Sequence, residues 1–162
     1  MKVKAIELAL ANLLILGLAI AVFASFGRVQ PFYPLNGMVT YERAPSFEWS
    51  GWSSDYELLI DDSPDFTTPM TYHVRGNRFR MPDNLEFGTY WWKVKGDGTE
   101  SEPKQFTVES VVALSRPEKD MIVNRGNTEL LVRSSGLAGA VVLGVNSTLE
   151  VGEDDNVLAE QK

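Results

Sequence analysis

Residues 85–96, LEFGTYWWKVKG, decide the fold that this sequence predicts. Apolar residues recur at every second position from Tyr90 to Val94, and the residues between them are polar except for Trp91, which is the period of a strand with one buried face. Residues 55–61, DYELLID, show the same period, with Leu59 as the exception. The alternation predicts a core built from these side chains: Phe47, Trp49, Tyr56, Leu58, Ile60, Tyr90, Trp92 and Val94.

Short runs of this kind recur between residues 38 and 108, separated by turn residues at roughly 8- to 12-residue intervals, as in a β-sandwich. We expect seven strands, at residues 38–41, 46–49, 55–61, 70–74, 78–81, 89–95 and 104–108. The preceding RVQPFYPLN (28–36) holds two prolines, which prevent a helix and predict an extended tether.

The stretches PSFEWSG (45–51), YELLIDDSPDF (56–66), LEFGTYWWKVKG and SEPKQFTV (101–108) resemble fibronectin type III-like modules of prokaryotic surface proteins. The resemblance implies an Ig-like β-sandwich over residues 29–109, with Trp49 and Tyr90 as core residues of the family. It specifies a fold and not a function, because such modules mostly serve as spacers or binding platforms. The absence of cysteine also suits a bacterial or archaeal envelope protein.

Residues 110–152 predict a second, smaller domain of β character. IVNRGNTELLV (122–132) and GLAGAVVLGV (136–145) are similar to small Ig-like domains of archaeal and bacterial envelope proteins. We expect strands at 111–114, 121–123, 129–133, 140–145 and 148–151. So few residues bury too little surface to be stable alone, so this domain should pack on the first domain or on a partner. Residues 153–162 predict an exposed acidic tail.

Residues 8–27 carry no charge and are long enough to cross a ~30 Å hydrocarbon core as a helix. Residues 1–28 therefore predict a transmembrane anchor in the lipid bilayer. Lys2 and Lys4 precede the run and Arg28 follows it, which favours a cytoplasmic N-terminus and β domains outside the cell membrane. A signal peptide cleaved near Ala24 is an alternative.

Asn12 lies deep in this segment. An amide in hydrocarbon favours a partner helix, and small residues allow close approach, so Ala9, Asn12 and Gly17 predict a helix-helix contact. A pilin-like filament subunit is a further alternative, because residues 5–8, AIEL, resemble the start of type IV pilins, whose N-terminal helices form the filament core.

The side chains that catalysis would need are scarce. His73 is the single histidine, there is no cysteine, and His73 should face solvent on its strand. We therefore expect neither an enzyme nor a cofactor. A net charge of −7 lacks the basic surface that a nucleic-acid partner requires.

Two acidic clusters favour turns over metal sites. Asp61, Asp62 and Asp65 share the segment DDSPD, and residues 153–155 read EDD. Calcium takes oxygen ligands, but the spacing matches no EF-hand loop, and Asp, Ser and Pro are common turn residues. We expect no metal at either cluster.

Trp91 is the position that most favours binding. If Tyr90 and Trp92 face the core, Trp91 faces outward beside Lys93, with Leu59 and His73 on neighbouring strands. Such a surface could bind a protein, stack on a glycan or be covered by the second domain. The sequon at Asn146 predicts a glycosylation site.

These features together predict a membrane-anchored, non-enzymatic accessory subunit that mediates protein contacts outside the membrane, within a larger membrane complex. Two alternatives stay open: a pilin-like filament subunit and a carbohydrate-binding surface module. Its partners would be the bilayer and other envelope proteins.

Overall fold

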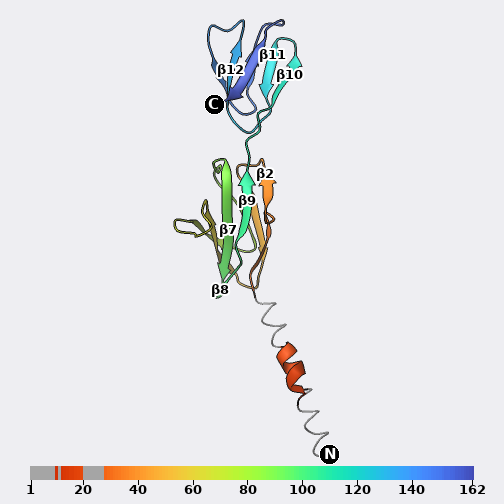
Figure 1. The fold of residues 1–162 in the computed structure, drawn as a ribbon, viewed down its shortest axis with the longest axis vertical. Coiled ribbons are helices and arrows are strands. Elements are labelled where there is room, and N and C mark those ends of the chain that lie inside the picture. Colours follow the sequence, from red (N-terminus) through yellow and green to blue (C-terminus); the bar gives the residue numbers. More distant parts are fainter. Residues whose placement is uncertain (1–9, 11, 20–27) are drawn as a thin grey trace, which may run out of the picture. The chain divides into compact units, whose positions relative to one another are not determined.

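The computed structural model describes residues 10, 12–19 and 28–162. Residues 10 and 12–19 are helical, and the remaining regular structure of the described chain is β (Figure 1). In these residues no helix has both the length and the apolar character needed to cross a membrane. The other positions of the predicted span, residues 8, 9, 11 and 20–27, lie outside the described part of the chain.

The chain forms two compact units whose segments alternate along the sequence. The first comprises Met1–Met38, Ser46–Met81 and Tyr90–Phe106, and the second comprises Val39–Pro45, Pro82–Thr89 and Thr107–Lys162. Within the second unit, the backbone N–H of Glu109 donates to the carbonyl oxygen of Thr40 at 2.9 Å. The domain limits predicted at residues 29, 110 and 153 stay predictions.

The seven strands predicted between residues 38 and 108 are confirmed, each end lying within one residue of its expected place. One sheet has the order β1-β3-β6, formed by Gln30–Tyr33, Ser46–Ser50 and Arg78–Arg80. The larger sheet has the order β2-β9-β7-β4-β5, formed by Met38–Thr40, Lys104–Val108, Gly88–Gly96, Asp55–Asp61 and Met70–Arg75. β8, Thr99–Glu100, also pairs with β7.

The tether predicted at residues 28–36 is wrong in part, because β1 lies within it. β1 pairs antiparallel with β3, with Gln30 opposite Ser50 and Pro31 opposite Trp49. Proline cannot donate a ladder hydrogen bond, but β1 is an edge strand, where this is tolerated.

The eight side chains predicted to form the core are all buried. Phe47 meets Trp92 edge-to-face with 5.1 Å between ring centroids, and it meets Phe106 at 5.6 Å. Trp49 and Tyr56 form a similar pair at 5.5 Å. Because these pairs join residues of the two sheets, they hold the sheets face to face, and each contributes about 0.5–1.5 kcal/mol beyond its buried area.

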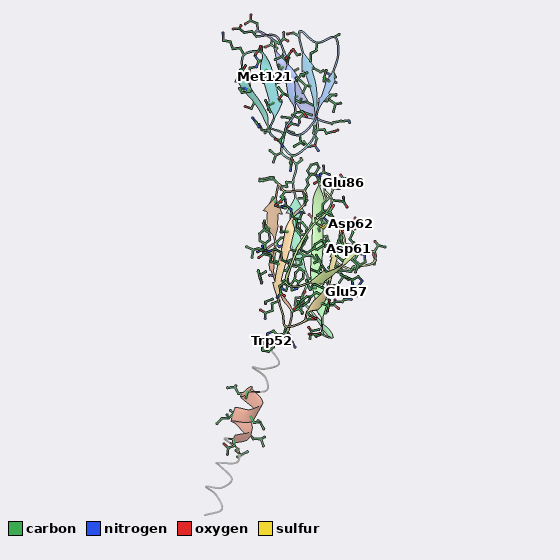
Figure 2. All side chains as sticks on the ribbon, turned by 180° about the vertical axis from the view of Figure 1, so that it is seen from behind. Trp52, Glu57, Asp61, Asp62, Glu86 and Met121 are labelled. Carbon is green, nitrogen blue, oxygen red and sulfur yellow. The ribbon has the colours of Figure 1, made fainter. Side chains whose placement is uncertain are left out.

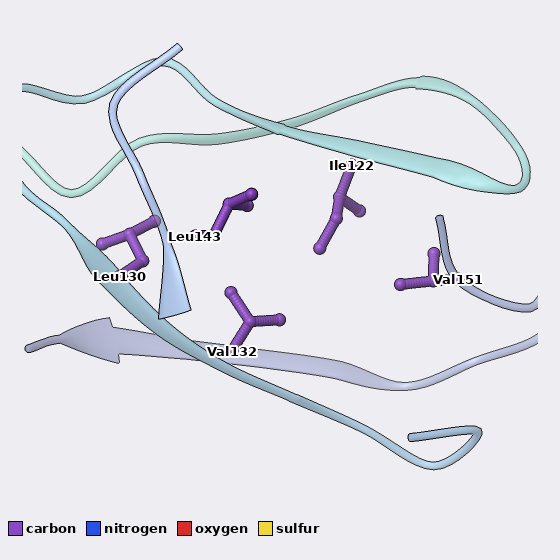
Figure 3. Close-up of a cluster of buried hydrophobic side chains, with 5 residues drawn as sticks. All are labelled: Ile122, Leu130, Val132, Leu143 and Val151. Atoms are coloured by element: carbon purple, nitrogen blue, oxygen red, sulfur yellow. The ribbon is translucent and has the colours of Figure 1, made fainter. Parts of the chain in front are cut away.

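Residues 114–161 form two three-stranded sheets. One has the order β10-β11-β14, formed by Leu114–Glu118, Met121–Asn124 and Thr148–Glu150. The other has the order β13-β12-β15, formed by Val141–Leu143, Leu130–Ser134 and Val157–Gln161. Figure 3 shows the aliphatic core of this region, made of Ile122, Leu130, Val132, Leu143 and Val151. The strand expected at residues 111–114 is displaced toward the C-terminus, because β10 begins only at Leu114.

The prediction that residues 153–162 form a tail without a strand is wrong. β15 pairs antiparallel with the whole of β12, from Leu130 opposite Gln161 to Ser134 opposite Val157. Val157 and Ala159 pack against the core, so the strand buries one face despite its acidic surroundings.

Candidate protein-contact face

The four residues predicted to bind around Trp91 lie on adjacent strands of the larger sheet. Leu59 on β4 is opposite Lys93 on β7, and Asp61 is opposite Trp91. They do not form one open surface, however. Leu59 is only 7% exposed and Trp91 is half-buried, whereas the His73 side chain is 81% exposed.

The segment after β4 explains why this face is less open than predicted. The Asp61 carboxylate accepts hydrogen bonds from the backbone N–H groups of Ser63 and Thr68, both at 3.1 Å. The turn brings the ring of Phe66, whose φ is +49°, to 4.1 Å from Lys93 Nζ. The loop after β4 thus covers Lys93, an outward-facing position on the neighbouring strand β7.

These hydrogen bonds also assign a role to the first acidic cluster. Both carboxylate oxygens of Asp61 close the turn that connects β4 and β5. Figure 2 labels Asp61 and Asp62 in this region. Among the residues that the structure describes, no group of three or more His, Asp or Glu side chains is placed to hold a metal ion.

Lys93 is held by an ion pair rather than left free for a ligand. Its Nζ lies 2.6 Å from Glu100 Oε1, and Lys95 Nζ lies 3.7 Å from the other oxygen. The hydrogen bond from Lys93 is the main reason that the pKa of Glu100 is lowered. His73 pairs instead with Glu57 at 3.8 Å.

The residues predicted for helix-helix contact are described only in part. Ala9 lies outside the described residues, while Asn12 and Gly17 are exposed on the helical stretch 12–19. Five residues on a helix correspond to a rotation of about 140°, so Asn12 and Gly17 cannot both face one partner helix. Asn12 and Gly17 would therefore need separate neighbours.

Asn146 lies in the turn between β13 and β14 rather than within a strand. It is exposed, and its φ of +57° is a left-handed conformation that asparagine tolerates. Its side chain is thus accessible, as glycosylation requires.

The outer face of the β13-β12-β15 sheet carries an apolar surface that the sequence analysis missed. Val142 on β13 lies opposite Leu131 on β12, and Leu158 on β15 lies opposite Arg133. Because paired residues point to the same side of a sheet, Leu131, Val142 and Leu158 share the side facing away from the core. Val142 is 45% exposed and Leu158 is 72% exposed.

Charged groups border this apolar face, which we call the β12 face. Arg133 Nη1 donates to Glu160 Oε1 at 3.0 Å across the β12-β15 pair. Leu131, Arg133, Leu158, Ala159 and Glu160 line a shallow groove there. An apolar centre next to a directional charged pair is the usual composition of a protein-contact surface. Recognising β15 as a strand was the missing step, since Leu158 joins the face only through that pairing.

No family model matches the chain, and neither does any curated protein. Among solved structures the chain is similar to the FN1-FN3 domains of chicken CNTN1, with a TM-score of 0.36 and 12% identity. That match covers 84% of this chain and 62% of the CNTN1 structure, so the chain spans less than two thirds of it. A segment of two fibronectin type III domains from chicken tenascin matches with a TM-score of 0.34 and 11% identity, covering 84% of this chain and 91% of that one. The chain is therefore similar in structure to fibronectin type III domains, at low TM-scores.

Proposed function

We propose that this chain is a membrane-anchored, non-enzymatic accessory subunit that binds another envelope protein outside the membrane through its β12 face. The apolar surface formed by the exposed Val142 and Leu158 and the half-buried Leu131 is the observation that carries the proposal. Apolar side chains gathered on one sheet face in this way favour a partner that removes them from water.

The charge-free run at residues 8–27 supports membrane anchoring. Its described positions, residues 10 and 12–19, are helical, and their leucines are exposed. A helix that presents leucine to its surroundings suits a hydrocarbon environment better than water. The charges of Lys2, Lys4 and Arg28 favour a cytoplasmic N-terminus.

Val142 and Val145 provide a matched pair of substitutions to test the contact. They are 45% and 43% exposed, but Val142 lies on the β12 face and Val145 lies in the turn after β13. The protein would be purified from native membranes in mild detergent. We expect Val142→Asp to lose a stoichiometric companion that the wild type and Val145→Asp retain. Equal retention by both variants would refute the contact.

Extraction of the native membranes with alkaline carbonate tests the anchor separately. We expect the chain to stay in the membrane pellet, because alkaline carbonate removes proteins held only by surface charge. Release into the supernatant would contradict membrane anchoring.

A further inference from the structure

Trp52 is the most exposed large apolar side chain among the described residues, with 78% of its surface accessible. It lies in the connection between β3 and β4, and Figure 2 labels it at one end of the first sandwich. Leaving an indole in water forgoes the benefit of burying one of the largest apolar side chains. A large exposed aromatic therefore points to a contact outside the described chain.

The residues around Trp52 are held in place, which keeps its side chain directed away from the core. Ser53 Oγ donates to the carbonyl oxygen of Asp55 at 2.7 Å and accepts from its N–H at 3.2 Å. A Cβ at Gly51 would lie 2.6 Å from the Tyr56 hydroxyl, so this glycine lets the chain pass close over the buried ring. The loop thus presents Trp52 without needing to rearrange.

The β1-β3 ladder ends two residues short of both Arg28 and Trp52. Gln30 pairs with Ser50 where β1 begins and β3 ends, Arg28 precedes Gln30 by two residues, and Trp52 follows Ser50 by two residues. Arg28 directly follows the charge-free run that ends at Gly27. One residue of extended chain covers about 3.3 Å, whereas the headgroup layer on each side of a bilayer is roughly 5–7 Å thick. Trp52 is therefore within reach of that layer.

Small residues lie in the turns near Trp52 at this end of the sandwich, with Asp97 following Gly96 as an acidic neighbour. The Gly76 N–H donates to the carbonyl oxygen of Ser54 at 3.2 Å, and a Cβ on Gly96 would lie 3.3 Å from the Cβ of Ser53. Nearby, Arg75 pairs with Asp55 at 3.4 Å, which neutralises one charge of each sign. The small residues of these turns let this end approach a membrane surface closely.

We infer that Trp52 inserts into the lipid headgroup layer and fixes the first sandwich at the membrane surface. Tryptophan is enriched at this depth because its ring is apolar and its N–H finds a polar partner there. The partner is the lipid interface itself. The inference rests on the membrane anchor of the proposed function.

Lipids brominated on their acyl chains, which quench nearby indoles, test this contact. The full-length protein would be reconstituted in phosphatidylcholine vesicles with and without the brominated lipid, and tryptophan emission compared after flotation. Trp52 is one of four tryptophans, so we expect the brominated lipid to remove up to about a quarter of the emission. Trp52→Phe should abolish this quenching. Trp91→Phe is the matched control, because the half-buried Trp91 lies on β7, and it should leave the quenching intact.

The flotation step separates the two claims. Protein that floats with the vesicles but is not quenched, or a Trp52→Phe variant quenched as strongly as the wild type, would overturn the interfacial role of Trp52 and leave the anchor standing. Protein that does not float would overturn both.

Discussion

Replacing Asn124 by alanine should destabilise residues 110–162 more than any exposed substitution in that region. Asn124 is fully buried at the end of β11. Its Nδ2 donates to the carbonyl oxygens of Thr128 at 2.8 Å and Leu143 at 3.1 Å, and its Oδ1 accepts from the Gly126 N–H at 2.9 Å. One side chain thus satisfies three backbone groups.

The cost of the substitution follows from those three bonds. A typical hydrogen bond contributes about 1 kcal/mol net, and a partner left unsatisfied in a buried site costs about 1–3 kcal/mol. The three bonds together give a loss of about 3 kcal/mol or more for Asn124→Ala. A region of about 50 residues has a free energy of unfolding of only about 3–8 kcal/mol. The variant should therefore lose much of the stability of this region.

The distribution of aromatic residues provides the assay. All tryptophans and tyrosines lie between residues 33 and 92, so tryptophan emission follows the first sandwich and is blind to residues 110–162. Far-UV circular dichroism follows both. We expect Asn124→Ala to lower the dichroism transition of the second region by roughly 12–24 °C while the emission transition stays in place. Asn156→Ala, at an exposed position directly before β15, is the control and should shift neither transition.

Asn124→Asp gives a sharper version of the same test. It places a carboxylate oxygen where Nδ2 now faces two carbonyl oxygens, which disfavours the ionised form and raises the pKa of the new carboxyl in the folded state. A raised folded-state pKa means that stability falls as pH rises through that value. At pH 7 the variant should be less stable than Asn124→Ala, and it should recover as the pH is lowered toward 4. Stability equal to wild type at pH 7, or no recovery in acid, would refute this account of the buried asparagine.

Three further outcomes follow from the geometry. Hydrogen bonds, first from the Ser134 hydroxyl, lower the pKa of Asp155 below its usual 3.8. The contribution of Asp155 to folding stability is therefore present above that value and is lost as the pH falls through the lowered pKa. Asp155→Asn should make the melting temperature depend less on pH in this range. Lys93→Met should raise the pKa of Glu100 toward its usual 4.5, measured by NMR titration of its side chain, and an unchanged value would contradict the role of the ion pair. Gly126→Ala should cost about 1–3 kcal/mol in chemical unfolding, because its Cβ would meet a backbone oxygen, whereas Gly139→Ala, with open space around it, should cost little.

The local period of the sequence was sufficient to predict the first sandwich. Tyr56, Leu58 and Ile60 occupy every second position of β4, and Tyr90 and Trp92 do so on β7. The sequence of each strand therefore indicates its buried face, although Leu59 and Trp91 place one apolar residue on each opposite face. β1 was missed because Pro31 within it and Pro34 directly after it were interpreted as breaking regular structure. Whether proline is tolerated depends on which side of the strand has a neighbour, and neighbours are set by pairing that a local period does not contain.

The predicted surface around Trp91 shows a different limit. Alternation correctly placed Leu59 on the face opposite the core, but it could not show that the turn closed by Asp61 brings Phe66 over the adjacent Lys93. A strand pattern assigns a side chain to a face of the sheet. It does not indicate whether another segment covers that face. A side chain predicted to be exposed is therefore buried where a loop folds over the sheet.

The β12 face depends on the register between β15 and β12, which are joined by long-range pairing. A shift of β15 by one residue against β12 would turn Leu158 into the core and place Val157 and Ala159 outside, because the side-chain period of a strand is two. Both alternatives put some apolar residues inward, so the sequence VLAEQ alone does not choose between them. The observed register partly buries Val157 and Ala159, which lie opposite Ser134 and Val132, and leaves the larger Leu158 in water. Leu158 lies on the solvent-exposed side of the sheet, beside Val142 on β13 and Leu131 on β12. β15 thus loses the burial of leucine that the alternative register would supply. A protein partner on that face would bury Leu158 instead.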